Sequence, residues 1–587
     1  MSSTPPTLAA RLAIAAGRLR ELGLVGLGAI AGIAAGAVVA AMGYLTHGLH
    51  ALLFGIEISD RLSAQLKLAS AGMALVPALG GVLIGLSLWW ARAHGARRPV
   101  DPIEANALTG GRMSIRDSLV VSAQTVISSG FGASVGLEAG YTQTASSLAS
   151  QLASLFHLKR ADVRTLVGCG AAGAISAAFG APLAGAFYAF ELIIGSYSVA
   201  LVAPVFAASL TARLTASWLG ADPIPIDLGT EVTTSIADLP VFLPLGVLGG
   251  FAAVVVMLLV TYCERAFRAC SCPQPIRPIL GGLAVGLLGY WSPQVLASGH
   301  GALHLELALE LSAGALALLF ALKAVAAALS LGSGFRGGLF FSSLFLGSLL
   351  GKLYVVVLPM LGISTHVPAM LAAIVGMAAM AVGAVGGPLT MTFLACETSG
   401  EWSIIGVVLG AAIASAIVVR ETFGYSFSTW RLHLRGETIR SAHDVGRIRN
   451  LTVGAMMREN VRTVASDETI AHFRAEFPLG SAQRVVALDA DGRYAGIAIV
   501  VDAHTPDRAT GGDIRIGEIL AHRDVVLTPS MTAEEAARLF RLAKSEELAV
   551  VDNPWDRNVV GLLTEQHLLR RYSEELDRTR RDLAGED

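Results

Sequence analysis

The sequence predicts an all-α membrane protein with many spans, followed by a smaller soluble domain of mixed α/β structure. Of its 587 residues, 53% are apolar and only 15% are charged, whereas about a quarter of the residues of a soluble protein are charged. The mean hydropathy is +0.61. A soluble core rarely grows beyond about 300 residues before the chain divides into domains. Past Arg431 the long apolar runs stop and charged residues recur throughout, which marks the start of the soluble domain.

The membrane domain is predicted at 24–430, after a polar N-terminal arm at 1–23. Arg11, Arg18 and Arg20 lie in this arm. Because basic residues stay on the cytoplasmic side of a membrane, we expect the N-terminus in the cytoplasm, and the C-terminal domain there as well. Apolar stretches long enough to cross the bilayer or to form broken spans lie near 24–54, 70–91, 118–156, 163–212, 240–263, 279–291, 312–335, 337–361, 368–396 and 402–419.

The membrane domain repeats internally, with halves at roughly 70–220 and 240–420. One shift along the sequence aligns two proline-containing segments that both end in glutamate, and a second shift aligns two glycine-rich segments. The aligned pairs are "GAPLAGAFYAFE" (180–191) with "GGPLTMTFLACE" (386–397), and "GFGASVGLEAG" (130–140) with "GSGFRGGLFFS" (332–342). Glycine-interrupted helices at corresponding positions of two halves are typical of transporters whose site lies between inverted repeats.

The glycine-rich turns are candidates for an anion pathway. Inside a bilayer, irregular backbone is tolerated only where it is buried in protein or faces a watery cavity. A turn that leads into a helix directs free N–H groups and the positive end of the helix dipole at one point, which favours an anion. The alternative is that these glycines only permit close helix crossings.

Glu138 is the sole charged residue between Ser118 and Phe156, and it lies in the first of these turns. A lone carboxylate in the membrane is costly unless it has a role or a partner. When ionised it can occupy the place of an anion, and when protonated it can leave that place. We therefore predict that Glu138 gates anion passage; the alternative is a buried carboxyl satisfied by backbone donors.

Glu191 and Glu397 stand at equivalent ends of the two aligned segments, each after a long apolar helix. Their symmetry predicts that at least one of them is structural and caps a neighbouring helix.

The soluble domain, predicted at 431–587, contains two similar segments at about 451–503 and 516–573. Each has a short helix, a short strand, a turn and an amphipathic helix, followed by a β-hairpin pattern. The first hairpin turns at Asp491-Gly492. The sequence thus predicts two copies of one β-α-β-β-α unit.

Composition and motifs exclude several functions. The 43 Lys and Arg nearly balance the 45 Asp and Glu, so there is no basic excess for nucleic acid. The membrane half contains no HExxH, GxSxG or P-loop pattern, which argues against an enzyme. A cation pathway would need clustered acids at the midplane. We expect no bound metal and reduced thiols at the five cysteines, which form no CxxC pair: Cys169, Cys263, Cys270, Cys272 and Cys396.

The segment from Gly130 to Glu191 resembles the gating-glutamate motif and the following helix pair of the CLC family of chloride channels and proton-coupled chloride transporters. The resemblance extends over the whole chain, and the tail repeats are similar to a pair of CBS domains. It implies that Glu138 is the external gating glutamate, with Gly136 and Leu137 beside the anion. "GGLFFSS" is similar to the family's GxFxP motif, which implies that the backbone of two further residues lines the central anion site, namely Leu339 and Phe340.

The chain departs from the family at several positions. The gating motif usually reads GxEGP, whereas residues 136–140 read GLEAG and lack the proline and the basic residue. The first anion loop, normally GSGIP, aligns with residues 98–102, so Pro99 and Val100 become candidate anion-binding residues. Pro99 replaces the serine that favours chloride, and in relatives a proline there accompanies nitrate preference.

Two further departures concern proton coupling and the pore aromatic residue. The internal proton-accepting glutamate of the transporters would follow Glu191, where this chain has Leu192. Either Glu191 or water then substitutes as a proton route, or the protein is an uncoupled channel, which we favour. The pore tyrosine matches Tyr425 best, with Phe427 as the other register.

The CBS pair of relatives commonly holds adenine nucleotide through a Thr or Ser followed three residues later by Asp. Here Thr564 supplies the hydroxyl, but His567 replaces the aspartate, and the first copy has Val500 in place of the hydroxyl. A structural role in dimerisation is the alternative to nucleotide binding.

Together these observations predict a CLC-type anion channel of the cell membrane. It would be a homodimer surrounded by lipid that carries chloride or another small monovalent anion and needs no cofactor. A proton/anion antiporter of the same fold is the alternative.

Overall fold

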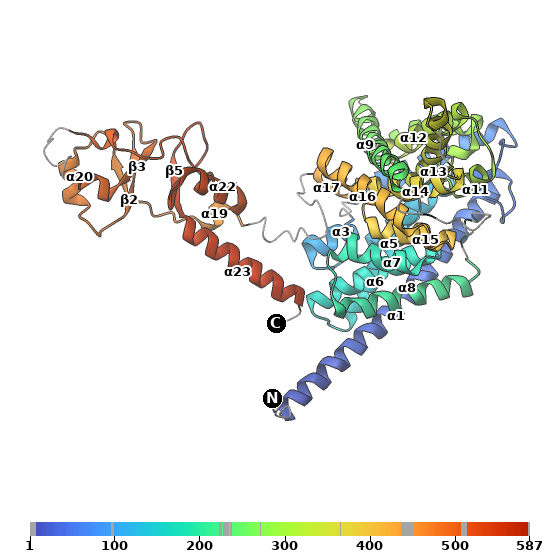
Figure 1. Ribbon diagram of the computed structural model, residues 1–587, viewed down its shortest axis with the longest axis horizontal. Coiled ribbons are helices and arrows are strands. Elements are labelled where there is room, and N and C mark those ends of the chain that lie inside the picture. Colours follow the sequence, from blue (N-terminus) through green and yellow to red (C-terminus); the bar gives the residue numbers. More distant parts are fainter. Residues whose placement is uncertain are drawn as a thin grey trace. The chain divides into compact units, whose positions relative to one another are not determined.

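The computed structural model describes residues 8–94, 99–221, 223, 226, 234, 238–270, 272–363, 366–435, 451–505 and 514–584. The chain divides into two compact units, Met1–Asp444 and Val445–Asp587 (Figure 1). The boundary predicted at residue 430 cuts through a helix, α17 (Phe427–His433), which belongs to the first unit. Residues 1–7 of the predicted arm and the start of the predicted tail, 436–450, lie outside the described residues.

The first half of the membrane unit consists of α1 (Leu8–Phe54), η1 (Leu62–Ala64), η2 (Ala71–Leu75), α2 (Val76–Ala93), α3 (Pro102–Glu104), η3 (Ala105–Thr109), α4 (Ile115–Gly130), α5 (Glu138–Leu155), α6 (Arg160–Phe179), α7 (Pro182–Tyr188), η4 (Ala189–Ile194) and α8 (Val199–Trp218). The helix α1 begins at Leu8 and continues into the first apolar stretch without a break. The N-terminal segment is therefore mostly helical and is not a separate arm, because its alanine- and leucine-rich sequence favours helix.

The second half consists of α9 (Leu239–Ala269), α10 (Arg277–Trp291), η6 (Pro293–Val295), α11 (His300–Ala308), α12 (Ala313–Ser333), α13 (Phe340–Val357), η7 (Leu358–Leu361), α14 (Ala369–Val385), α15 (Pro388–Ser399) and α16 (Ile405–Thr422), and α17 follows it. Among the described residues, seven helices are long and apolar enough to cross a membrane. Several of the remaining helices, among them α7 and α15, are short, as expected for broken spans.

The two halves pack in the same pattern. In the first half α5 packs on α6, α6 on α8, and α1 on α8; in the second half α13 packs on α14, α14 on α16, and α9 on α16. Two further contacts join equivalent helices of the two halves, α2 with α10 and α7 with α15. A helix that packs against its own counterpart lies next to the symmetry axis, so the halves are related by a two-fold axis that passes between them.

The segments that carry the repeated GAP and GGP sequences reverse the chain in both halves. Gly180 ends α6 and Gly386 ends α14, with φ of 69° and 95°, a region of backbone conformation that glycine adopts without strain. Pro182 and Pro388 then begin α7 and α15, where the fixed φ of proline suits the first helical turn.

The helices α7 and α15 run antiparallel, as their caps show. Glu397, in α15, accepts hydrogen bonds from the N–H groups of Leu183 and Ala184 at the start of α7, both at 2.9 Å. Glu191, directly after α7, accepts from Leu389 N–H at 3.1 Å and Thr390 N–H at 2.8 Å at the start of α15. The expected structural role of these glutamates is thus found in both halves. The repeats are inverted relative to each other.

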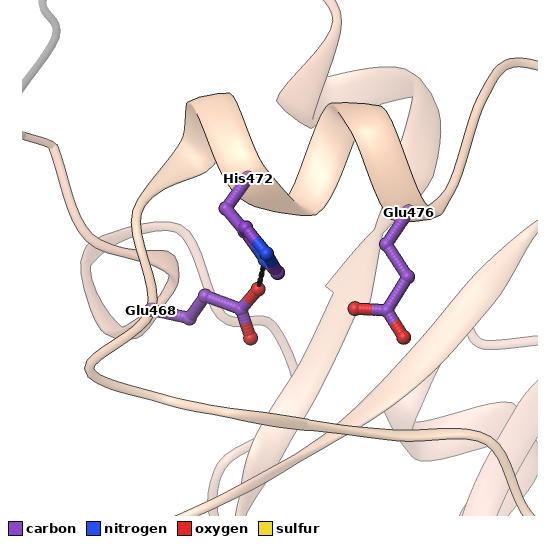
Figure 2. A group of neighbouring side chains, drawn as sticks. All are labelled: Glu468, His472 and Glu476. Carbon is purple, nitrogen blue, oxygen red and sulfur yellow. Dashed lines mark hydrogen bonds and ion pairs between the residues drawn. The ribbon is translucent and has the colours of Figure 1, made fainter.

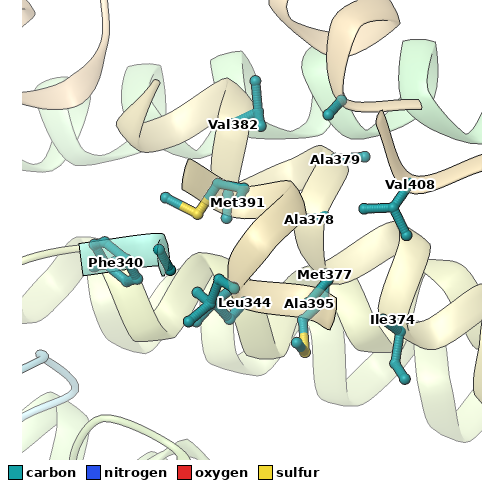
Figure 3. Packing of buried hydrophobic residues seen from close by; sticks show 14 of the residues in the cluster. Phe340, Leu344, Ile374, Met377, Ala378, Ala379, Val382, Met391, Ala395 and Val408 are labelled. Atoms are coloured by element: carbon teal, nitrogen blue, oxygen red, sulfur yellow. The ribbon is translucent and has the colours of Figure 1, made fainter. Parts of the chain in front are cut away.

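Small residues let the helices approach closely, as the pattern of Gly, Ala and Ser predicts. A Cβ on Gly170 of α6 would lie 2.5 Å from the carbonyl oxygen of Ala145 in α5. Larger apolar side chains fill the space between α13, α14, α15 and α16, with Leu344, Met377 and Met391 in one continuous core (Figure 3).

The soluble unit contains two copies of one α/β arrangement. The first copy has α19 (Val453–Met456), β1 (Thr463–Ala465), α20 (Ile470–Glu476), β2 (Arg484–Leu488), β3 (Tyr494–Ile499) and α21 (Val500–Ala503), and the second has η9 (Ile516–Glu518), α22 (Ala533–Ala543), β4 (Glu547–Val551), β5 (Val559–Thr564) and α23 (Glu565–Ala584). β1 pairs parallel with β2, and β2 pairs antiparallel with β3. The second copy repeats this with β4 and β5 antiparallel and with Leu527 bridged parallel to Val550. The two predicted copies are confirmed.

Candidate functional site

The two glycine turns meet in the middle of the membrane unit. Gly136 N–H donates to Gly338 O at 3.1 Å, and Gly338 N–H donates to Gly136 O at 3.3 Å. These glycines are equivalent positions of the two repeats. The helix α5 begins two residues after the first and α13 two residues after the second. Two helix N-termini, each with unsatisfied N–H groups and a positive dipole end, therefore start from one short antiparallel bridge.

The side chain of Glu138 folds back over this bridge. The residue is 4% exposed, and a Cβ placed on Gly136 would overlap its carboxylate oxygens. The carboxylate also interacts with the backbone N–H of Phe341, in the first turn of α13, while its Oε2 has no hydrogen-bond partner. A carboxyl group thus occupies the place to which the helix N-termini point.

A cavity of about 170 Å³ lies on one side of Glu138. Pro99, Glu138, Leu339 and Phe340 all line it, so the structure brings together three predicted segments that are far apart in the sequence. Val100 does not line the cavity; its carbonyl accepts a hydrogen bond from Gln143, at 2.8 Å.

Phe427 lines this cavity, whereas Tyr425 does not. The hydroxyl of Tyr425 is 3.2 Å from Nδ1 of His433, and its ring stacks on the His433 ring. Phe427, the other predicted register for the pore aromatic residue, is therefore the one of the two that reaches this cavity. Tyr188, a third aromatic residue on this cavity after Phe340 and Phe427, was not singled out from the sequence.

Basic residues gather around the same cavity. Arg336 precedes the second glycine turn, Arg431 lies in α17 and Arg435 follows it; all three line the cavity together with two carboxylates, Asp101 and Glu138. Positive potential in a cleft attracts and concentrates anions. The signal for two of them was present in the sequence as the basic run "WRLHLR" after the last apolar stretch, but nothing there showed which way it faces.

A second cavity, of about 470 Å³, lies next to the neighbours of Glu138 in the same turn and helix. Leu137 and Tyr141, from the same turn and helix as Glu138, line it together with Phe341. The first cavity is lined by Glu138, Leu339 and Phe340. Glu138 and the start of α13 therefore separate two hollows.

Glu191 is not among the described residues that line either cavity. Both of its carboxylate oxygens are engaged, because Thr390 adds a hydroxyl hydrogen bond of 2.6 Å to the two backbone bonds of the cap. Leu192, next to it, supplies no titratable group.

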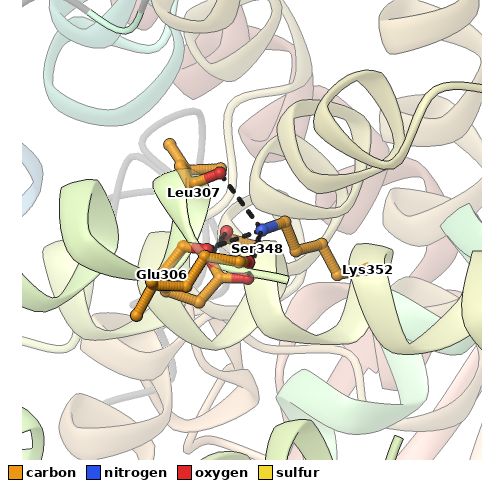
Figure 4. Close-up of polar contacts among 5 residues, drawn as sticks. Glu306, Leu307, Ser348 and Lys352 are labelled. Atoms are coloured by element: carbon orange, nitrogen blue, oxygen red, sulfur yellow. Dashed lines mark hydrogen bonds and ion pairs between the residues drawn. The ribbon is translucent and has the colours of Figure 1, made fainter. Parts of the chain in front are cut away.

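A buried ion pair fixes the second half of the site. Glu306, at the end of α11, is 2% exposed, and Nζ of Lys352, in α13, lies 3.4 Å from its Oε1. Lys352 also donates to the carbonyl oxygens of Glu306 and Leu307, and Ser348 donates to Oε2 of Glu306 at 2.8 Å (Figure 4). The network holds α11 against the helix whose N-terminus faces Glu138.

In the soluble unit, Thr564 ends β5 and its hydroxyl accepts a hydrogen bond from the N–H of His567, at 3.2 Å. This hydroxyl caps α23. Partial burial and the neighbouring Arg570 lower the pKa of His567 from its usual range, so the imidazole is neutral at pH 7. Val500, in the corresponding place of the first copy, is buried and begins α21.

One group of side chains in the described chain has the spacing of metal ligands. Glu468, His472 and Glu476 lie at the surface near α20, with ligand atoms within 4.8 Å of one another. His472 hydrogen-bonds Glu468 (Figure 2). Both His472 and Glu476 are exposed.

Inverted halves that bring two helix N-termini to one carboxylate, with a hollow on each side, define an ion-transport protein whose pathway runs between its repeats. The sequence family described as voltage gated chloride channel matches residues 79–420, and the CBS domain family matches residues 516–574. The chain belongs to the CLC family of chloride channels and transporters and carries a C-terminal CBS pair.

Named relatives and solved structures agree with this assignment. The voltage-gated ClC-type chloride channel ClcB of Escherichia coli O9:H4 and that of Shigella flexneri are each 29% identical over 392 residues, which cover 66% of this chain and 94% of theirs. A slow cyanobacterial Cl−/H+ antiporter has the same fold with a TM-score of 0.60 at 19% identity, covering 70% of this chain and 97% of its own. A eukaryotic CLC transporter covers 93% of this chain and 98% of its own, with a TM-score of 0.58 at 19% identity.

Proposed function

We propose that the protein carries chloride or another small monovalent anion through the site at Gly136 and Gly338, with Glu138 as its gate. The observation that supports this most is the position of the Glu138 carboxylate, at the bridge between the glycine turns and beside the N–H of Phe341. There the ionised side chain takes the place of an anion. Protonation removes its charge and its attraction to the helix N-termini, so the side chain leaves and an anion enters.

We infer a channel and not a coupled antiporter. The residue after Glu191 is Leu192, so the usual inner proton acceptor is missing, and the oxygens of Glu191 are held in the cap of α15. The alternative, a proton/anion antiporter, has support from structural neighbours described as Cl−/H+ and fluoride/proton antiporters. Purified protein in liposomes separates the two: a chloride gradient that drives protons uphill would contradict a channel.

The gate is tested by Glu138→Gln, which imitates the protonated carboxyl. Chloride flux into liposomes is measured from pH 4.5 to 7.5, with Glu310→Gln at an exposed site as the matched control. We expect the wild type and the control to conduct several-fold faster at the acidic end, and Glu138→Gln to be fast and nearly independent of pH. Full pH dependence in Glu138→Gln would contradict the gate.

Pro99 supports nitrate as the second candidate anion. It lines the cavity beside Glu138 in place of a serine hydroxyl, which is a chloride-favouring donor. Chloride, nitrate and fluoride fluxes are compared in the wild type and in Pro99→Ser. The proposal expects nitrate to exceed chloride in the wild type and the ratio to fall in Pro99→Ser; equal fluxes unchanged by this substitution would discard it.

We propose a cell-membrane homodimer with one pathway per chain and both termini in the cytoplasm, in which the CBS pair stabilises the dimer. The use of the Thr564 hydroxyl in capping α23 supports a structural role over nucleotide binding. ATP and AMP added at millimolar concentration are expected to leave the thermal transition of the soluble unit unchanged. A rise of several degrees would instead assign an adenine nucleotide to the pair.

A further inference from the structure

The larger of the two cavities beside Glu138 is built from the end of α1, the loop that follows it, and the start of α11. Four histidines and one arginine line it: His47, His50, His300, His304 and Arg61. In the part of the chain that the structure describes, no Asp or Glu is among its lining residues. We propose that this cavity is a second anion-binding site, at which protonated histidines hold an anion before or after it passes Glu138. The inference rests on the proposed transport function.

One of these histidines, His50, has a ring nitrogen that no group in the described chain satisfies, whereas Nδ1 of His300 lies 2.5 Å from the Ser298 hydroxyl. His50 is 5% exposed; its Nε2 lies 3.0 Å from the carbonyl oxygen of Ser129, and its Nδ1 is buried without a hydrogen-bond partner. Since the carbonyl can only accept, Nε2 carries the hydrogen in the neutral ring, and Nδ1 becomes a second donor when the ring is protonated. A protonated His50 therefore needs an acceptor in the cavity, and an anion supplies it.

Two basic residues near the histidines, Arg61 and Lys323, favour an anion. Arg61 of the loop contacts His47, and Lys323 of α12 is fully buried and donates to the carbonyl oxygens of Val295 and Ala297. From α5, Tyr141 lines the cavity and Glu138 acts on it electrostatically, and in the loop the hydroxyl of the lining residue Ser59 donates to Glu57 at 3.5 Å. Since no carboxylate is among the described lining residues, binding of an anion and protonation of the histidines stabilise each other.

A single residue, Phe341, links the lining of this cavity to Glu138. The ring of His300 stacks on that of Phe341, with 3.4 Å between the ring centroids. The backbone N–H of Phe341 interacts with the Glu138 carboxylate. Phe341 therefore contacts both a histidine of the proposed anion site and the carboxylate of Glu138, so that only this residue separates the two places.

The size of the cavity indicates what it holds. Its volume of about 470 Å³ far exceeds that needed by a single water, for which about 10–15 Å³ of such space is enough. A small anion would keep much of its hydration shell there. The cavity thus concentrates chloride and nitrate alike, and selection between them is left to the narrower site at Glu138.

The test uses Glu138→Gln as the background, because it removes the titration of the gate. The chloride concentration that gives half-maximal flux is measured in liposomes at pH 5.5 and 7.5, with acid applied to either face in turn. We expect this concentration to fall about 3- to 10-fold when one face is acidified. Adding His47→Gln and His304→Gln should abolish the change, whereas adding His94→Gln, at the exposed end of α2, should leave it intact.

A half-maximal concentration that is independent of pH on both faces, or a pH dependence that survives His47→Gln and His304→Gln, would overturn the second site. Absence of any anion flux in the wild type would instead contradict the proposed function. A measurement without histidine variants guards against misfolding: bromide soaked into wild-type crystals at pH 5.5 should give anomalous density among the four histidines. Density at Glu138 alone would also overturn the inference.

Discussion

The two halves of the membrane unit share a scaffold but differ where the pathway runs. At the helix caps they are alike: Glu191 and Glu397 each hold the start of the other half's helix, and the equivalent rings of Phe187 and Phe393 stack with centroids 4.6 Å apart. At the bridge the halves differ, because the shift that aligns Gly136 with Gly338 aligns Glu138 with Phe340. The difference indicates that the symmetric positions build the fold, whereas Glu138, which we propose as the gate, has no carboxylate counterpart in the second half.

The largest expected effect concerns how each half holds the helix that begins at the bridge. In α13 Lys352 makes a buried ion pair with Glu306. At the equivalent place of α5, Ser150 donates to Gly111 O at 2.7 Å and accepts from the N–H of Met113 at 3.1 Å. Removal of one partner of a buried ion pair costs about 3–5 kcal/mol, and loss of a buried hydroxyl's bonds about 1–3 kcal/mol.

Lys352→Met should therefore lower the free energy of unfolding more than Ser150→Ala does, measured by thermal denaturation in detergent. Adding Glu306→Leu to Lys352→Met should recover part of the loss, because the uncompensated charge is gone. Equal losses for Lys352→Met and Ser150→Ala would mean that the two halves are held equally well, and that the ion pair adds nothing.

The caps predict a smaller effect of similar size in both halves. Glu191→Ala removes three hydrogen bonds and Glu397→Ala removes two. We expect each to cost about 1–3 kcal/mol, since bonds to a charged group are worth more than neutral ones, and Glu191→Ala to cost more. The same proteins in liposomes decide the proton route. If Glu191 also conducts protons, only its replacement changes proton flux, and a purely structural role leaves proton flux unaffected by either variant.

The bridge itself offers the sharpest comparison of equivalent residues. A Cβ on Gly136 would overlap the Glu138 carboxylate, whereas a Cβ on Gly338 would meet nothing closer than Ala139 Cβ at 3.8 Å. Gly136→Ala should therefore displace the flexible end of Glu138 and weaken the pH dependence of chloride flux several-fold. Gly338→Ala, its counterpart, should leave that dependence unchanged. The same response in both variants would show that the carboxylate does not rest on Gly136.

The sequence was sufficient to predict what the repeats share. The two shifts paired Gly136 with Gly338, and the structure joins these residues by hydrogen bonds. The matching of Glu191 and Glu397 likewise predicted a helix cap, because a buried carboxylate beside a helix start needs N–H donors. Both predictions depend on local patterns that occur twice in the chain, so each copy supported the other.

The features that the sequence did not reveal depend on contacts between distant segments. The partners Glu306 and Lys352 come from helices that only the fold brings together. The histidines of α1 and α11 likewise become one cavity only when the halves pack. The different placement of Tyr425 and Phe427 has a local cause: Gly424 turns the chain with φ of 81°, so that Tyr425 stacks on His433 and Phe427 lines the cavity.

The soluble copies extend the comparison, with the smallest expected effect. At the second hairpin, hydrogen bonds from the Asn558 side chain and then from the N–H groups of Asn553 and Asn558 lower the pKa of Asp552 below its usual value. The carboxylate therefore stabilises the hairpin above about pH 4, the ordinary pKa of aspartate, and this contribution is lost as the pH falls through the lowered value. In the first hairpin, Asp489 accepts only from the N–H groups of Asp491 and Arg493.

We expect amide hydrogen exchange to show β4 and β5 losing protection in acid in the full-length protein. Asp552→Asn should make the protection of these strands less dependent on acid, whereas Asp489→Asn should leave it as in the wild type. Exchange rates are compared between variants at each pH, so that the intrinsic effect of pH on exchange cancels. If both variants respond alike, the side-chain amide of Asn558 does not distinguish the hairpins, and the two soluble copies are equivalent at their tips as well as in their cores.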